Sequence, residues 1–278
     1  MAKARGDGVL ARWQVRSPAP RAFPLAALDP GAKPFSLGDK ARDQAAVEDL
    51  AQEIDALQDC LFADRRHKLL VVLQGTDGSG KDGTIRGVFG KVSPLGVHAV
   101  GFRAPTEEER SHDFLWRVHR MVPAAGELAI FNRSHYEDLL VPMAESGMKR
   151  AEALVRCRQI VDFERLLTET GTTVLKFMLL ISKKEQKERL QARIDDPSKA
   201  WKFDPHDLEV RKRWDAYQDA YAFMLGHTGT PHAPWTIVPA DSKSHRNLMI
   251  ATVVRDTLAG MGLRYPPAKE GVAGVRVR

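Results

Sequence analysis

A glycine-rich segment at residues 75–84, with the sequence GTDGSGKDGT, has the spacing of a loop that binds phosphate groups. It follows the short apolar run at residues 69–73 and precedes a helical pattern, which is the usual context of such a loop. The glycines let successive backbone N–H groups converge on phosphate oxygens, while a helix N-terminus and a lysine supply positive charge. We therefore expect phosphate to be bound by Gly75, Gly78, Ser79, Gly80, Lys81, Asp82, Gly83 and Thr84.

Two acidic residues depart from the ordinary form of this loop. Asp82 stands where Ser or Thr usually holds magnesium. Asp77 places a carboxylate inside the loop, where it would repel phosphate unless a cation lay between them. Asp77 therefore either binds Mg²⁺ or orients an attacking phosphate group. The missing hydroxyl favours the metal role, because a magnesium ligand must then come from another position.

A second polar segment, NRSHYED, follows the apolar residues 127–132, which predict another strand. In a fold with a phosphate loop, this is where a second carboxylate reaches the metal. Asn132 occupies the place of the expected aspartate, so Glu137 and Asp138 become the candidate carboxylates. Arg133 can bind a phosphate with its forked guanidinium group. His135 is expected to be a packed or hydrogen-bonded core residue.

Apolar runs alternate with helical periodicity along the chain, which predicts an α/β fold with a parallel sheet covered on both faces. Strands are predicted at 69–73, 97–100, 127–132, 172–181 and 235–238. Helices are predicted at 41–63, 81–91, 107–121 (with Thr106 as N-cap), 149–170, 183–193, 207–225 and 248–261. Periodicity does not give the order of the strands in the sheet.

The 278 residues carry a net charge of +6, which favours an anionic partner such as nucleic acid, a phosphate polymer or acidic lipid. The positive charge is concentrated in residues 1–42 (net +5), 182–214 (net +3) and 264–278 (net +3), whereas the remainder is acidic. With 43% hydrophobic residues, the chain is neither wholly disordered nor collagen-like. It lacks an apolar run long enough for a spanning helix or a secretory signal, so a cytoplasmic protein with no membrane partner is expected.

Five blocks together resemble polyphosphate kinase family 2 over about residues 33–265. They read GTDGSGKDGT, FRAPTEEERSHDFLWRVH, GELAIFNRSHYEDLLV, ISKKEQKERLQARIDDPSKAWKF and, near the end, PW-IVPADSK. The resemblance implies a P-loop kinase-like three-layer α/β/α fold with a helical lid. It implies transfer of a phosphoryl group from inorganic polyphosphate to nucleotides with Mg²⁺, with Mn²⁺ as an alternative ion.

The form of the third block is similar to the class III branch of that family, which is associated with both AMP and ADP as acceptors. This implication rests chiefly on Asn132 and Glu137. Adenine nucleotides are expected, with guanine nucleotides as an alternative, together with a homo-oligomer that is a dimer or a tetramer. The polyphosphate donor accounts for the anionic partner, so nucleic acid is not expected.

The resemblance also assigns roles to residues outside the loop. Arg189, Arg193 and Lys202 lie in the basic segment 182–214, which becomes the lid, and all three are expected to bind phosphates of the polyphosphate donor. Direct in-line transfer is expected, with Lys81 holding donor phosphates and with Asp77 and Asp138 holding Mg²⁺. The catalytic set is Asp77, Lys81, Arg133, Glu137, Asp138, Arg189 and Arg193. Nucleotide binding is assigned to Asp77, Arg103, Asp113, Arg117, Asn132, Arg133 and Glu137.

The expected organisation is an irregular N-terminal arm at 1–40, a single kinase domain at 41–265 and a C-terminal tail at 266–278. Two other functions compete with the polyphosphate reaction. An ATP-dependent nucleoside monophosphate kinase would share loop and lid, but the absent Ser or Thr after Lys81 argues against it. A non-enzymatic polyanion-binding protein would use the basic ends, but it has no use for Asp77.

Overall fold

The computed structural model describes residues 8–19, 21–270 and 275–276. Six strands form one sheet in the order β1-β6-β5-β2-β4-β3. The strands are β1 (Gln14–Val15), β2 (Lys68–Gln74), β3 (Val97–Gly101), β4 (Leu128–Asn132), β5 (Thr172–Leu180) and β6 (Trp235–Pro239). All neighbouring pairs from β6 to β3 are parallel, which confirms the predicted parallel sheet.

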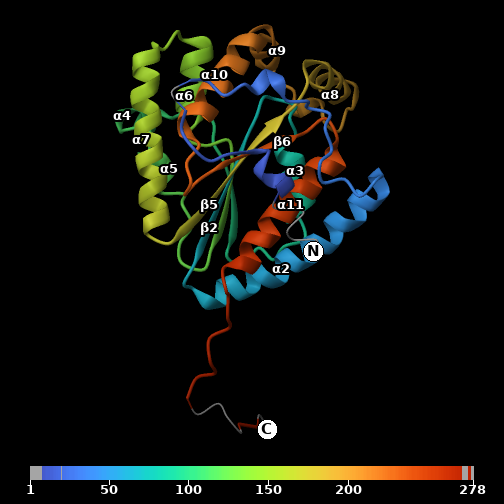
Figure 1. Ribbon diagram of the computed structural model, residues 1–278, viewed down its shortest axis with the longest axis vertical. Helices are drawn as coiled ribbons and strands as arrows, with labels where there is room; N and C mark the ends of the chain where they lie inside the picture. The colour runs from blue at the N-terminus through green and yellow to red at the C-terminus, as the bar shows by residue number, and fades with distance from the viewer. Residues whose placement is uncertain (1–7, 20, 271–274, 277–278) are drawn as a thin grey trace.

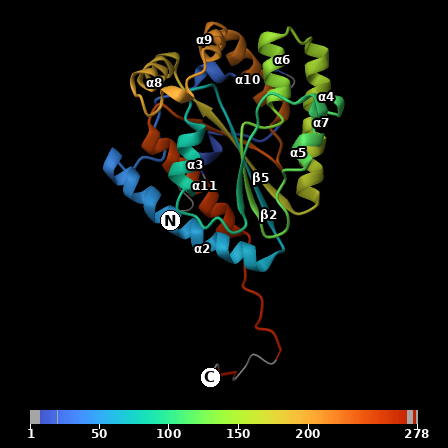
Figure 2. The ribbon, with the colours of Figure 1, turned by 180° about the vertical axis from the view of Figure 1, so that it is seen from behind.

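Helices cover both faces of the sheet, as the three-layer prediction requires (Figures 1 and 2). On one face lie α2 (Lys40–Asp64), α3 (Lys81–Phe89) and α11 (Lys243–Gly260); on the other lie α5 (Trp116–His119), α6 (Glu137–Glu145), α7 (Arg150–Glu169) and α10 (Trp214–Thr228). The remaining elements are η1 (Leu25–Ala27), α4 (Glu107–Ser111), α8 (Lys183–Asp195), η2 (Ala200–Lys202) and α9 (His206–Lys212). No helix among the described residues is long and apolar enough to span a bilayer.

The central strand β2 shows why its sequence forms a buried strand. Leu70 and Val72 contribute to the core on the α7 side, whereas Leu69, Val71 and Leu73 contribute to the core on the α11 side. Successive strand residues point to opposite faces, so an apolar run is needed where helices cover both of them. All five side chains are fully buried.

Two predicted helices are divided in the structure. The helix expected at 107–121 is present as α4 and α5, because the chain leaves the helical conformation at His112. Thr106 does cap α4, in a reciprocal capping box with Glu109. The helix expected at 207–225 is divided at Arg213 into α9 and α10.

The N-terminal segment adds an antiparallel edge strand that periodicity did not indicate. β1 pairs with β6, and the following residues bond to α10, with Ala19 N–H donating to Gly226 O over 2.6 Å. Gly226 permits this approach, because a Cβ there would lie 2.3 Å from Arg21 O. The division into arm, domain and tail stays a prediction, and residues 1–7, 20, 271–274 and 277–278 lie outside the described part.

The sheet order places the polar loops beside one another. β2 lies between β4 and β5, so the loops after β2 and β4 emerge side by side at the carboxyl edge of the sheet. α8 and α9 lie over this same edge, where β5 ends (Figure 1). In open parallel sheets, ligands bind at the carboxyl ends of the strands.

Candidate active site

The loop after β2 has the backbone of a phosphate cradle. Gly75, Gly78 and Gly80 have φ values of +149°, +82° and +101°, all in the positive range that residues with side chains rarely adopt. At Gly75, a Cβ would lie 2.8 Å from Leu179 O, so the loop also packs too closely for a larger residue. The side chain of Lys81 is buried, and its Nζ donates to Gly75 O (2.6 Å) and Thr76 O (3.2 Å).

Hydroxyl groups line the same loop. The Oγ atoms of Thr76, Ser79 and Thr84 are buried, yet they find no hydrogen-bond partner among the described residues. Unpaired buried polar atoms are costly, and a functional site is one of the few settings that retains them. The loop is therefore built to present donors to a ligand such as phosphate.

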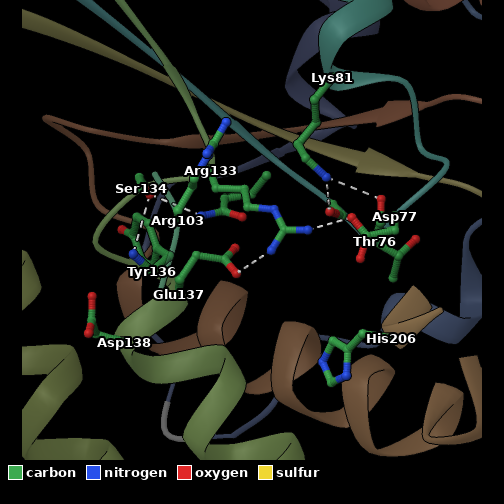
Figure 3. Close-up of polar contacts among 12 residues, drawn as sticks. Thr76, Asp77, Lys81, Arg103, Arg133, Ser134, Tyr136, Glu137, Asp138 and His206 are labelled. Carbon is green, nitrogen blue, oxygen red and sulfur yellow. Dashed lines mark hydrogen bonds and ion pairs between the residues drawn. The ribbon is translucent and has the colours of Figure 1, made fainter. Parts of the chain in front are cut away.

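Arg133 joins the two predicted polar segments. It directly follows β4 and has a φ of 63°, which is uncommon for a residue with a side chain. Its guanidinium contacts Asp77 Oδ1 at 2.5 Å and Glu137 Oε2 at 3.3 Å. Figure 3 shows Arg133 between these two carboxylates, with Lys81 on the Asp77 side. The structure thus brings together Asp77, Lys81, Arg133 and Glu137.

The charges in this group perturb one another. Burial would raise the pKa of Asp77, but Lys81 and Arg133 outweigh it and hold that pKa below its usual value. Burial lowers the pKa of Lys81, and Asp77 opposes this effect. For Glu137, burial raises the pKa despite the nearby Arg133 and Lys81. Such opposed shifts among neighbouring groups are typical of functional sites.

Asp138 is directed to a different place. Its Oδ2 accepts from the Arg117 guanidinium at 3.0 Å, and Arg117 also donates to Arg103 O at 2.8 Å. In Figure 3, Asp138 lies on the far side of Glu137 from Asp77. The structure does not show Asp138 in contact with Asp77, its predicted partner in metal binding.

A cavity of about 610 Å³ opens beside the Arg117–Asp138 pair. Asp113, Phe114, Arg156 and Gln159 are among its lining residues, and the Arg156 guanidinium lies over the Phe114 ring at 4.2 Å. Asp113 and Arg117 therefore share one cavity, whereas Arg103 contributes its backbone carbonyl to Arg117.

The lid arginines are held by protein groups. Arg189 donates to the carbonyl oxygens of Gly78 (3.0 Å), Ser79 (3.1 Å), Ala240 (2.6 Å) and Asp241 (2.9 Å), which ties α8 to the loop.

Arg193 pairs with Asp207 Oδ2 at 3.1 Å. The side chain of Lys202, the third predicted donor contact, lies outside the described part of the structure.

Several site residues were not found from the sequence. Gln74 is the last residue of β2. Its amide nitrogen donates to Glu137 Oε1 (2.9 Å), and its amide oxygen accepts from Ser134 N–H (3.1 Å). Its signal was a polar residue closing an apolar strand. Arg246 is buried against the loop, where a Cβ on Gly80 would lie 1.9 Å from its NH1. Burial and the nearby Arg189 lower the pKa of Arg246 to about 9.

A buried polar network supports the Arg133 segment from behind. Lys176 Nζ donates to Glu164 Oε2 (2.6 Å) and Tyr136 Oη (2.9 Å), and Tyr136 O–H donates to Glu164 Oε1 (2.7 Å). His135 is fully buried with its Nε2 3.4 Å from the same Oε1, as expected for a hydrogen-bonded core histidine. The charged Lys176 within an apolar strand was the sequence signal for a buried partner.

The donor atoms present suit a magnesium ion. Mg²⁺ is usually held by one or two carboxylates and substrate phosphates, with water completing its octahedron. Asp77 supplies a carboxylate at the loop, beside the unpaired hydroxyls. No group of three or more His, Cys, Asp or Glu side chains converges on one point within the described ranges.

Comparison with known proteins identifies the family. A family model described as "Polyphosphate kinase 2 (PPK2)" matches residues 37–265. The "AMP/ADP-polyphosphate phosphotransferase" of Meiothermus ruber is 49% identical over 226 residues, covering 80% of this chain and 85% of that protein. The "ADP-polyphosphate phosphotransferase" of Rhodopseudomonas palustris is 38% identical, covering 77% and 78%.

A solved structure extends the agreement to three dimensions. The crystal structure of polyphosphate kinase 2 from Arthrobacter aurescens TC1 is 43% identical, with a TM-score of 0.88, and the match covers 93% of this chain and 92% of that one. The sequence blocks, the sheet with its phosphate loop and these matches agree. The chain belongs to the polyphosphate kinase 2 family.

Proposed function

We propose that the protein transfers the terminal phosphoryl group of inorganic polyphosphate to AMP and to ADP, producing ADP and ATP. The observation that carries this proposal is the position of Arg133, held between Asp77 and Glu137 beside the Lys81 loop. The name of the Meiothermus ruber relative supports both acceptors. The class III assignment rests on Asn132 and Glu137, and it agrees with the two acceptors in that relative's name.

The reaction is a direct in-line displacement. An oxygen of the acceptor's terminal phosphate attacks the terminal phosphorus of polyphosphate, the bond to the next bridging oxygen breaks, and polyphosphate leaves shortened by one unit. Lys81 and the loop N–H groups bind donor phosphates, while Arg133 and Arg193 stabilise charge on the transferred group. Catalysis of this kind rests on positioning and electrostatics, so no covalent intermediate is required.

Arg189 has a supporting part in this proposal. Its side chain is nearly buried and donates to four carbonyl oxygens, two of them in the phosphate loop. These bonds favour a role in fixing the loop against the lid. Its direct contact with donor phosphate stays a prediction, as does that of Lys202.

The acceptor nucleotide occupies the cavity beside Arg117. This cavity is lined by Asp113 and Arg117, two of the residues assigned to nucleotide binding, and Arg103 supports Arg117 through its carbonyl. Asp138 neutralises Arg117 there and orients it. Its predicted part as a magnesium ligand receives no support from this contact.

Magnesium, or manganese in its place, would neutralise and orient the phosphate oxygens when bound. Asp77 is the residue at the loop best placed to hold it, because its carboxylate belongs to the loop and lies near Lys81 and Arg133. With nucleotide acceptors, the proposed setting is cytoplasmic. The proposed assembly is a dimer or tetramer, measurable by light scattering.

The test incubates the full chain with Mg²⁺, long-chain polyphosphate and, separately, AMP, ADP, GMP or GDP, and products are separated by chromatography. We expect ADP and ATP from AMP, and ATP from ADP. Phosphorylation of GMP or GDP would show that guanine nucleotides are acceptors as well. If no tube yields a phosphorylated nucleotide, the proposed function is wrong.

A further inference from the structure

The two departures from the ordinary phosphate-loop pattern meet in the folded protein. Asn132 Nδ2 donates to Asp82 Oδ1 at 2.6 Å, although 50 residues separate them in the chain. Asp82 lies in the first turn of α3, directly after Lys81, and Asn132 is the last residue of β4. The contact therefore joins the start of the loop's helix to the end of the neighbouring strand.

These are the two positions that hold magnesium in ordinary P-loop enzymes. There, a Ser or Thr after the lysine and an Asp at the end of the neighbouring strand share the ion. Here the first position carries the carboxylate and the second carries a neutral amide. The pair keeps one negative charge in total, but the charge has moved from the strand to the helix.

The surroundings of Asp82 leave its carboxylate available. The residue is exposed, and it takes part in no salt bridge among the residues that the structure describes. Two buried hydroxyl groups near Asp82 in the chain have no hydrogen-bond partner among the described residues. They belong to Ser79, just before α3, and to Thr84, within α3, and are free to bind a ligand. Asp138, in contrast, is engaged by Arg117.

We propose that Asp82, oriented by Asn132, is the second carboxylate that holds the divalent cation on the donor phosphates, in place of Asp138. This inference rests on the proposed function. The Asn132 amide orients Oδ1 of Asp82 by its hydrogen bond and leaves Oδ2 to the hydrated ion. Asp77 and Asp82 then supply the one or two carboxylates that Mg²⁺ ordinarily takes from a protein.

The test measures the affinity of the full chain for Mn²⁺ in the presence of tripolyphosphate and without nucleotide. The electron paramagnetic resonance signal of free Mn²⁺ reports how much of the ion is bound. D82N is expected to weaken Mn²⁺ binding by about tenfold or more, in line with losses at metal sites generally. The exchange variant D82N/N132D restores one carboxylate and one amide in contact. It is expected to recover affinity to within about threefold of the original chain.

D162N is the matched control, because Asp162 is an exposed aspartate on α7 and its loss changes the net charge equally. It should leave Mn²⁺ affinity unchanged. Wild-type affinity in D82N would overturn the proposal, as would a folded exchange variant that stays as weak as D82N. If D82N does not fold, N132A decides: it keeps Asp82 but removes the amide that orients its carboxylate. Mn²⁺ binding must then weaken, and unchanged binding contradicts the proposal.

This readout separates the inference from the proposed function. Mn²⁺ binding requires neither acceptor nor turnover, so an inactive wild-type chain could still show the effect of D82N. Conversely, an active wild-type enzyme whose D82N variant binds Mn²⁺ normally would refute only the assignment of Asp82.

Discussion

At the scale of single residues, the site depends on one acid in an unusual place. Asp77 lies within a loop that otherwise presents N–H groups and a lysine, and it contacts Arg133 from the neighbouring strand end. Its negative charge partly neutralises Lys81 and Arg133. In the proposed reaction, the same charge would attract a cation to the phosphate loop, as a magnesium-dependent transfer requires.

The first prediction concerns this carboxylate. Asp77→Asn keeps the shape of the side chain but removes its charge, so kcat with polyphosphate and AMP should fall by about 100-fold or more. The measurement is steady-state kinetics at saturating Mg²⁺, with thermal unfolding to confirm that the variant is folded. Asp162→Asn serves as the charge-matched control. Near-normal turnover of Asp77→Asn would disprove the metal and positioning role.

A second acid, Asp207, gives a prediction on pH. Burial and the charge of Asp77 raise its pKa from 3.8 to about 6, although Arg193 opposes the shift. The folded protein binds the proton of Asp207 more tightly than the unfolded chain does. The stabilisation that this proton provides is therefore lost as pH rises from about 4 to about 6.

Asp207→Asn removes this titration. Its free energy of unfolding relative to the original chain should therefore rise by about 1–2 kcal/mol between pH 4.5 and pH 7. Urea unfolding at several pH values measures the difference. A difference that stays constant with pH, or that falls, would show that the pKa of Asp207 is not raised.

At the scale of elements, much of the sheet and most helices could be predicted. The runs that became β2, β4 and β5 are apolar on both faces, so periodicity and flanking glycines suffice to locate them. The loop after β2 was recognisable because its glycines have to adopt φ values that few residues tolerate. In both cases, the requirement is local to the segment.

Features that depend on distant partners could not be predicted. β1 is a two-residue strand that exists only because β6 pairs with it. The break at His112 interrupts a segment whose helical pattern continues across it. Two contacts at the site also depend on the tertiary fold: Asn132 donates to Asp82, and Arg117 donates to Asp138. The sequence identified these residues but not their pairing.

The third prediction concerns the buried pair that links β5 to α7. Lys176 and Glu164 are fully buried and 2.6 Å apart, and Lys176 with His135 holds the pKa of the Glu164 carboxyl below its usual value despite burial. Removing one partner leaves an uncompensated charge, so Lys176→Met should cost about 3–5 kcal/mol of stability.

The double variant Lys176→Met/Glu164→Gln removes both charges and should lose clearly less than Lys176→Met alone. Chemical denaturation of the two variants and of Glu164→Gln completes a double-mutant cycle. Additive losses would contradict a coupled ion pair at this position.

At the scale of the whole molecule, the fold separates the phosphate loop from the cavity that we propose for the acceptor. The phosphate loop lies under α8, whereas the cavity with Arg117 lies beside α4, α5 and α7. Arg133, which follows β4, and Glu137, the first residue of α6, lie between them. The described part of the C-terminal segment leaves the molecule at the end opposite α8 and α9, so its basic charge lies away from the loop (Figure 1).

Polyphosphate, rather than ATP, is the phosphoryl donor in the proposed reaction. The most direct measurement is kcat/KM for long-chain polyphosphate and for ATP as alternative donors, with AMP as acceptor and Mg²⁺ held constant. We predict that kcat/KM for polyphosphate exceeds that for ATP by about tenfold or more, since Asp82 replaces the hydroxyl of ATP-dependent loops. A kcat/KM for ATP equal to or above that for polyphosphate would contradict the account and favour an ATP-dependent nucleoside monophosphate kinase.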